Sequence, residues 1–260
     1  MSRYLAGNIP ADPDLVRNDP NVVASSFMNY GYEDVDGSAP RLSLKEPDEL
    51  RRRSIQLYNY VISGLALEGK DVLEVSSGRG GGCRYIYESF GPRSVTGLDR
   101  SEASIEFSSM VNPSPNLMFR SGDAEAMVFA DASFDVVINV EASHCYGSMD
   151  RFLSEVRRVL RPGGIFSWVD ARFQEDIPAL EEAFARSGLK LLRSADITRN
   201  VLQALDDGSD ETLTWIRHDV PLLLRPLIES ALAVRGTVVF NAFKEGELLY
   251  LSRRFESVQP

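Results

Sequence analysis

The stretch "KDVLEVSSGRGGG", residues 70–82, decides how this chain folds. Its first half is a short apolar run of the kind that forms a buried strand. Its second half carries glycines at positions 78, 80, 81 and 82, which let the backbone turn sharply and approach a ligand closely. A glycine-rich turn by itself is equally compatible with packing alone, so the strands that follow must decide its role.

Apolar runs and amphipathic helical patterns alternate along the chain on both sides of this turn. Further strands are predicted at 94–99, 116–123, 133–140, 164–171 and 189–195, with helices starting near residues 47, 82, 101, 150 and 174. Strands that alternate with helices through short loops predict a parallel, doubly wound sheet of the α/β class. The alternating run at 246–257 is expected to return to the sheet as an edge strand.

This pattern divides the chain into four segments. Residues 1–46 are rich in Pro, Asp, Asn and Gly and are predicted to form an N-terminal segment or cap, ahead of a sheet core at 47–195. Residues 196–245 have a mainly helical pattern that cannot belong to the sheet, and we expect a substrate lid there. Residues 246–260 supply the final strand and the C-terminus.

The bulk composition is that of an ordinary globular protein, with 260 residues, 43% hydrophobic and 25% charged. A net charge of −10 argues against a nucleic-acid partner, because phosphate binding needs clustered Lys and Arg. The most apolar long run, 220–234, contains charged residues and is too short to span a bilayer. Two cysteines fit a reducing compartment, so we expect a cytoplasmic protein, either monomer or homodimer.

Acidic residues stand at the carboxyl ends of three successive predicted strands. Glu74 and Asp99 end the first two strands, and Asp123 ends the third. Such residues line one crevice outside the strand ends, which is hard to explain as packing. Asp99, 19 residues beyond Gly80, can accept both hydroxyls of a ribose, and Asp123 can face an adenine edge. No Walker lysine follows the loop, which argues against ATP-phosphate binding.

The series "VLEVSSGRGGG", "GLD", "GDAEAMVFADASFDVVINVEAS" and "EVRRVLRPGG" resembles the class I S-adenosylmethionine-dependent methyltransferases. The sequence also has "MNYGYED" upstream of these motifs and "NVEASHCY" before the last of them. With these two stretches it resembles the phthiotriol/phenolphthiotriol dimycocerosate methyltransferases and related polyketide and lipid O-methyltransferases. The resemblance implies a Rossmann-like fold: a doubly wound, mostly parallel seven-stranded sheet with an N-terminal cap and a helical lid before the last strand. It also implies that S-adenosylmethionine is the cofactor and leaves as S-adenosylhomocysteine.

Within that family, Glu74 and Gly78 would meet the methionine portion, Asp99 the ribose, and Asp123 with Ala124 the adenine. Tyr32 would help the cap to close over the cofactor. Ser76 stands where most of these methyltransferases have glycine. The full predicted cofactor-binding set is Tyr32, Glu74, Ser76, Gly78, Gly80, Asp99, Arg100, Asp123, Ala124, Asn139 and Val140.

His144 is the strongest candidate for chemistry, as one of only two histidines in the chain. Transfer of a methyl group to a hydroxyl requires removal of a proton, for which an imidazole is suited at neutral pH. In this fold the fifth strand lies beside the fourth, so Asp170 at its end would face His144 and fix its tautomer. The alternative is that His144 only bonds a loop or contacts the cofactor. Glu141 could pair with His144, accept a substrate hydroxyl, or stabilise a helix N-terminus.

Other candidates carry less weight. Cys145 next to His144 invites a thiol mechanism, but adjacent side chains usually point apart. His218 is expected to be a solvated surface residue. The lid run 220–234 with Trp215, Phe240 and Phe243 forms either a wide apolar pocket or simply helix packing.

The sequence therefore predicts a metal-independent O-methyltransferase acting on an alcohol, phenol or acid of a mainly apolar secondary metabolite such as a polyketide, lipid or terpenoid. His144 would be the general base, with Asp170 and Glu141 as the other catalytic candidates. A C-methyltransferase acting on an activated carbon is the nearest alternative. A non-catalytic regulator that binds S-adenosylmethionine is a more remote one.

Overall fold

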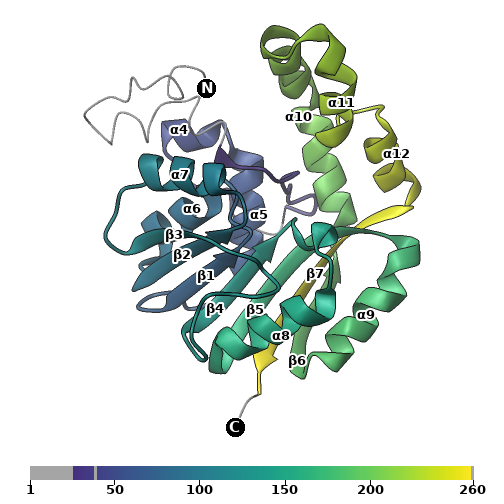
Figure 1. The fold of residues 1–260 in the computed structure, drawn as a ribbon. Helices are drawn as coiled ribbons and strands as arrows, with labels where there is room; N and C mark the ends of the chain where they lie inside the picture. The colour runs from purple at the N-terminus through teal and green to yellow at the C-terminus, as the bar shows by residue number, and fades with distance from the viewer. Residues whose placement is uncertain (1–25, 38–39, 259–260) are drawn as a thin grey trace.

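A seven-stranded sheet lies between two layers of helices in the computed structural model, which describes residues 26–37 and 40–258 (Figure 1). The strands are β1 (Asp71–Val75), β2 (Ser94–Asp99), β3 (Leu117–Ser121), β4 (Phe134–Val140), β5 (Leu160–Phe173), β6 (Leu189–Asp196) and β7 (Leu248–Ser257). Their order across the sheet is β3-β2-β1-β4-β5-β7-β6. The predicted mostly parallel, doubly wound sheet is confirmed.

The strand order reverses between β1 and β4, which run parallel to each other in the middle of the sheet. In doubly wound sheets, ligands bind outside the carboxyl ends of the strands at such a switch point. The topology therefore places the candidate site at the ends of β1 and β4. Parallel pairing of β4 with β5 brings Asn139 opposite Trp168 and Val140 opposite Val169.

The position predicted for the last strand is wrong. β7 does not lie at the edge of the sheet: it pairs antiparallel with β5 on one side and β6 on the other. Tyr250, Leu251 and Phe255 are buried on both faces of β7, as expected for an inner strand. β6 is the edge strand, and its residues 190–194 are all exposed.

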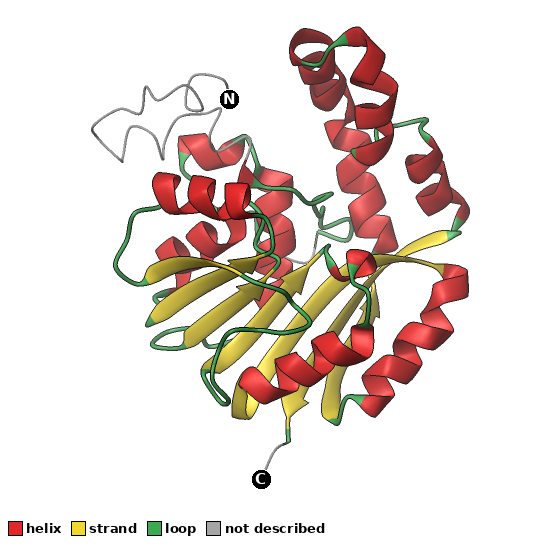
Figure 2. Ribbon diagram, viewed as in Figure 1, coloured by secondary structure: helices red, strands yellow, loops and turns green. Residues whose placement is uncertain are grey.

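Helices cover both faces of the sheet (Figure 2). They are α4 (Glu46–Glu49), α5 (Arg52–Ile62), α6 (Gly81–Phe90), α7 (Glu102–Val111), α8 (Met149–Val159), α9 (Ile177–Arg186), α10 (Thr198–Asp219), α11 (Arg225–Ala231) and α12 (Val238–Glu245), with short 3-10 turns η1 (Ser143–Cys145), η2 (Gln174–Asp176) and η3 (Leu222–Leu224). None of the described helices is both long and apolar enough to cross a membrane.

Two hydrophobic clusters, one on each face of the sheet, hold these layers together. Val72 of β1 packs in one cluster with Ile55 of α5, whereas its neighbour Leu73 packs in the other with Phe152 of α8 and Phe184 of α9. Successive residues of a strand point to opposite faces, so a continuous apolar run is needed where both faces are covered. The apolar runs of the sequence have this origin.

The block from α10 to α12 stands above the carboxyl end of the sheet in Figure 1. It is helical, as expected, but the residues predicted to line a lid pocket separate. Phe240 and Phe243 are buried in the cluster that also contains Tyr250, whereas Trp215 is 50% exposed. Within the run 220–234, Leu222, Leu223, Leu224 and Leu227 are exposed. Its role as a lid stays a prediction.

Candidate active site

The glycine-rich turn between β1 and α6 combines packing glycines with one open position. A Cβ on Gly82 would lie 2.1 Å from the ring of Tyr58, and one on Gly80 2.8 Å from the ring of Phe119. Gly78 has a positive φ of 53°, and an added Cβ there would meet only the sulfur of Met28, at 3.4 Å. Gly80 and Gly82 therefore allow close packing, while Gly78 is the point where a ligand can approach the backbone.

Glu74 is the last residue but one of β1, and its carboxylate is turned into the core, where the side chain is almost fully buried. Its two oxygens accept a hydrogen bond from the Tyr58 hydroxyl at 2.5 Å and one from the Cys83 thiol at 2.9 Å. Burial raises the pKa of Glu74 to about 7, although these two hydrogen bonds lower it. Glu74 thus supports the turn from beneath, and its predicted contact with a methionine group stays a prediction.

Asp99 lies at the end of β2, half-buried, with both oxygens held by backbone amides. Gly78 donates to Oδ2 at 2.8 Å and Ser101 donates to Oδ1 at 2.9 Å. These bonds fix the carboxylate beside the glycine-rich turn. Asp123, two residues beyond β3, is exposed and accepts from the Glu125 amide, while Ala124 is buried.

Asn139 joins the ends of β1 and β4 and is fully buried. Its amide nitrogen donates to the Val75 carbonyl and to the Tyr146 hydroxyl, both at 2.9 Å, and that hydroxyl lies 2.6 Å from Oγ of Ser76. The amide oxygen of Asn139 has no hydrogen-bond partner among the described residues. An unsatisfied buried acceptor is costly, because it has lost its hydration without gaining a hydrogen bond.

His144 and Asp170 form the predicted pair. The Nδ1 atom of His144 lies 2.8 Å from Oδ1 of Asp170, and the His144 amide donates to Oδ2 at 2.9 Å. Asp170 is fully buried, whereas the His144 side chain is 44% exposed. Nδ1–H donation to the carboxylate leaves Nε2 as the proton acceptor. The hydrogen bond to Asp170 raises the pKa of His144 above its ordinary value, outweighing the opposite effect of burial.

Glu141 follows β4 in the left-handed conformation, with φ of 50°, which strains a residue other than glycine. Its Oε2 atom accepts from the Tyr30 amide at 2.9 Å and from the Tyr250 hydroxyl at 2.8 Å. Burial raises the pKa of Glu141 to about 8. Asp170, and not Glu141, is hydrogen-bonded to the His144 ring. Glu141 instead accepts hydrogen bonds from the Tyr30 amide and the Tyr250 hydroxyl.

The sequence analysis missed several residues that the structure places in the site. Ser143 and Arg172 contact Asp170 directly, and Tyr146 joins Asn139 to Ser76. The aromatic-rich stretch at 27–32 was a signal for Tyr30, but the prediction named Tyr32.

Tyr32, predicted to help close the cap, stacks on the ring of Tyr60 with centroids 4.8 Å apart. Arg100 is exposed next to Asp99, and Val140 is buried at the end of β4. Cys145 is exposed, and His218 is 85% exposed beside Asp219. Within residues 26–37 and 40–258, none of these five side chains is hydrogen-bonded or ion-paired to His144 or Asp170.

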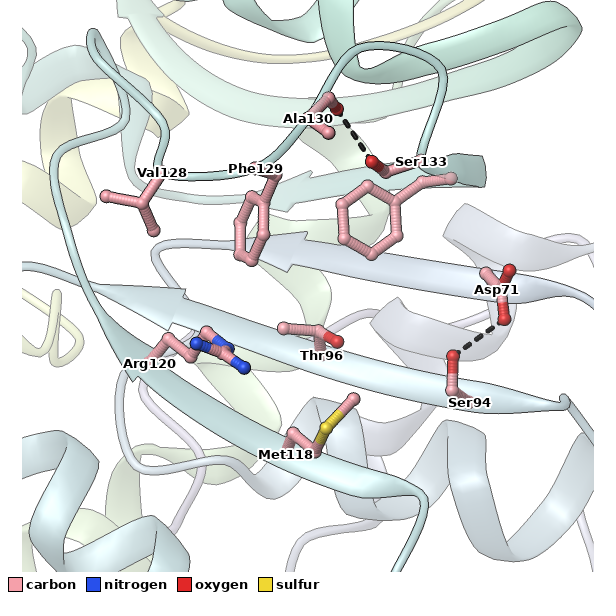
Figure 3. A pocket seen from close by; sticks show the side chains of 10 residues that line it. Asp71, Ser94, Thr96, Met118, Arg120, Val128, Phe129, Ala130 and Ser133 are labelled. Atoms are coloured by element: carbon pink, nitrogen blue, oxygen red, sulfur yellow. Dashed lines mark hydrogen bonds between the residues drawn. The ribbon is translucent and has the colours of Figure 1, made fainter.

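A separate cavity of about 390 Å³ lies away from this site (Figure 3). Asp71 and Ser94, which begin β1 and β2, line one part, and Val128 and Phe129 of the β3–β4 connection line another. The site residues stand at the opposite, carboxyl ends of the strands. The Asp71 carboxylate is already paired with arginines, so this cavity offers no free catalytic group of that kind.

Comparison with known proteins agrees with this geometry. Residues 73–168 match a family model described as a methyltransferase domain. The phthiotriol/phenolphthiotriol dimycocerosates methyltransferase of Mycobacterium tuberculosis is 40% identical over 224 residues, which cover 86% of this chain and 82% of the relative. The fatty-acid O-methyltransferase of Mycolicibacterium smegmatis is 42% identical over 203 residues, covering 78% and 73%.

Solved structures show the same fold. The geranyl diphosphate C-methyltransferase of Streptomyces coelicolor, in complex with S-adenosyl-L-homocysteine, gives a TM-score of 0.65 at 18% identity, covering 96% of this chain and all of that one. The [4+2]-cyclase SpnF gives 0.70 at 17% identity, covering 94% and 93%. Because these folds host different reactions, the assignment comes from the sequence relatives. The chain belongs to the class I S-adenosylmethionine-dependent methyltransferases, and S-adenosylmethionine is its cofactor.

Proposed function

We propose that this methyltransferase acts on a hydroxyl oxygen and that His144 is the general base. The observation that carries the proposal is the pairing of a half-exposed imidazole with a fully buried carboxylate at the carboxyl end of β4 and β5. A nucleophilic carbon can bond to the methyl group before its proton leaves, whereas a neutral hydroxyl must lose its proton as it reacts. The pair therefore favours O-methylation.

The residues of the cofactor site fit a nucleoside that carries an amino acid on a sulfonium sulfur. Asp99, fixed by the Gly78 and Ser101 amides, would receive the ribose hydroxyls, and the unpaired oxygen of Asn139 would accept from the ammonium group. Asp123 and Ala124 would border the adenine. The other predicted cofactor residues remain part of the proposal: Tyr32, Glu74, Ser76, Gly78, Gly80, Arg100 and Val140.

Bound S-adenosylmethionine supplies the methyl group and leaves as S-adenosylhomocysteine. His144 Nε2 takes the proton of the acceptor hydroxyl while the hydroxyl oxygen bonds to the methyl carbon. Asp170 holds the Nδ1–H bond at 2.8 Å, so the imidazole presents Nε2 and its positive charge is stabilised after proton transfer. Glu141, held by Tyr30 and Tyr250, lies at the same strand end and is proposed to contact the acceptor.

The acceptor is proposed to be a mainly apolar secondary metabolite such as a polyketide, lipid or terpenoid. The names of two relatives support this class, since one acts on phthiotriol and phenolphthiotriol dimycocerosates and the other on fatty acids. The apolar residues of the α10–α12 block lie above the carboxyl end of the sheet, where such an acceptor would enter. We place the enzyme in the reducing cytoplasm, which suits its free cysteines, Cys83 and Cys145.

The test is His144→Ala, assayed with methyl-labelled S-adenosylmethionine and a panel of apolar alcohols, phenols and acids. We expect turnover to fall by about 10²–10⁴-fold, while S-adenosylhomocysteine binds as tightly as in the wild type. His218→Ala, which changes an exposed histidine in α10, is the matched control and keeps full activity. Turnover of the His144 variant near the wild-type level would refute the base role, and fragmentation of the labelled product separates O- from C-methylation.

A further inference from the structure

Arg172 is a buried cation that contacts Asp170 on the side away from the His144 ring. The proposed mechanism gives it no role. It lies two residues beyond Asp170 on β5, so both side chains point to the same face of the sheet. The Nη1 atom lies 2.8 Å from Oδ2 of Asp170, and the guanidinium lies over the Trp168 ring at 5.4 Å. Only 7% of the Arg172 side chain is exposed.

Ser143 fixes this arrangement from η1. Its hydroxyl donates to Oδ2 of Asp170 at 2.8 Å and accepts from Nε1 of Trp168 and from Nη2 of Arg172, both at 2.8 Å. Asp170 thus meets the His144 ring through Oδ1, and the His144 amide and the Arg172–Ser143 pair through Oδ2. A carboxylate so enclosed has a fixed orientation, because rotation would break several bonds at once.

We propose that Arg172 is a positioning residue that offsets part of the buried charge of Asp170, so that this carboxylate orients His144 without binding the imidazole proton too tightly. The inference rests on the proposed role of His144 as base. A base must give up its proton before the next turnover, and an unbalanced buried carboxylate would keep it protonated.

The electrostatics agree with the geometry. Burial alone would raise the pKa of Asp170, but the hydrogen bond from His144 and the charge of Arg172 lower it below its ordinary value. For His144, the hydrogen bond to Asp170 raises the pKa, while burial and the charge of Arg172 act against that rise. The other titratable groups facing the pair are Glu141 at the end of β4, Tyr30 of the N-terminal segment, Tyr146 just after η1 and Tyr250 of β7. All of them stay in place in the variants below.

The direct test is an NMR titration of the His144 ring. A His218→Gln background leaves a single imidazole, because the chain has two histidines. In Arg172→Met the midpoint should rise by about one pH unit, since the charge of Asp170 then acts on His144 alone. Arg172→Lys keeps the positive charge and should shift the midpoint of the His144 titration much less. Arg253→Met removes an equally buried arginine that pairs with Glu181 of α9 instead of with Asp170, and should leave the midpoint unchanged.

A midpoint that stays constant or falls in folded Arg172→Met would overturn the proposal. If Arg172→Met does not fold, Ser143→Ala tests the proposal instead, because it removes one donor to Asp170 and one contact of Arg172. The midpoint of the His144 titration must then rise, by less than the one pH unit expected for Arg172→Met. The pH profile of kcat separates this inference from the proposed function. A His144 titration that moves while the acid limb of the kcat profile stays fixed would refute the base role and leave the positioning role standing.

Discussion

Glu74 is a carboxylic acid held in the core, and its replacement by glutamine should change how stability depends on pH. Burial raises its pKa from 4.5 to about 7 in the folded protein. Between these two pH values the folded state binds more protons than the unfolded chain, so the free energy of unfolding falls as pH rises. The loss begins near the unfolded pKa and is complete once pH exceeds the folded pKa.

The size of the effect follows from the same two pKa values. A displacement from 4.5 to about 7 corresponds to about 3 kcal/mol of unfolding free energy. Glutamine carries no charge at any of these pH values, so Glu74→Gln does not suffer this loss. The variant should therefore gain about 3 kcal/mol relative to the wild type between pH 4.5 and pH 8.5, whatever constant cost the lost Tyr58 or Cys83 bond adds.

Urea unfolding followed by circular dichroism at four or five pH values measures this difference. Glu106→Gln, on the exposed side of α7, is the matched control and should track the wild type at every pH. Glu141, whose pKa is also raised by burial, is present in all three proteins and cancels in the comparison. A stability difference between Glu74→Gln and wild type that is the same at pH 4.5 and 8.5 would show that Glu74 ionises as it does in water.

Three further predictions concern the site. Asp99→Ala should weaken S-adenosylhomocysteine binding by about 10- to 100-fold in calorimetry, the worth of a charge-assisted hydrogen bond; unchanged affinity would remove Asp99 from the ribose site. Gly82→Ala places a Cβ 2.1 Å from Tyr58 and should cost about 1–3 kcal/mol in urea unfolding, with wild-type stability contradicting the packing role. Asp170→Asn should lower kcat by at least about 100-fold with little change in cofactor affinity, because the amide cannot hold the same His144 tautomer; a kcat near wild type would separate Asp170 from the chemistry.

The strands of the sheet could be predicted from the sequence, but the position of every strand within the sheet could not. Alternation of apolar runs and helices predicted the parallel core, because each crossover helix must cover a sheet face. The run 246–257 was predicted correctly as a strand and wrongly as an edge. Its alternation shows that it is extended, but which strands it joins depends on long-range packing of residues such as Tyr250 and Phe255.

The same limit applies to the site. Asp170 could be placed beside His144 because adjacent parallel strands bring their carboxyl ends together, and the 2.8 Å contact has this origin. Ser143 and Arg172 carry no motif, and their importance depends on side-chain direction around a buried charge. Tyr30 contacts Glu141, whereas Tyr32 stacks on Tyr60. Both lie in an irregular segment, which has no sequence periodicity from which the direction of either side chain could be predicted.

The inner position of β7 has a consequence for how the protein is made. The ribosome completes β5 and β6 before it synthesises the strand that joins them, so a nascent chain can assemble only the five-stranded part of the sheet that runs from β3 to β5. Until β7 arrives, β5 exposes an open edge beside Asp170, and Glu141 lacks the Tyr250 hydroxyl. Chains that stop before β7 are therefore open-edged, aggregation-prone sheets, and the Tyr250–Glu141 hydrogen bond can form only after that strand has been made.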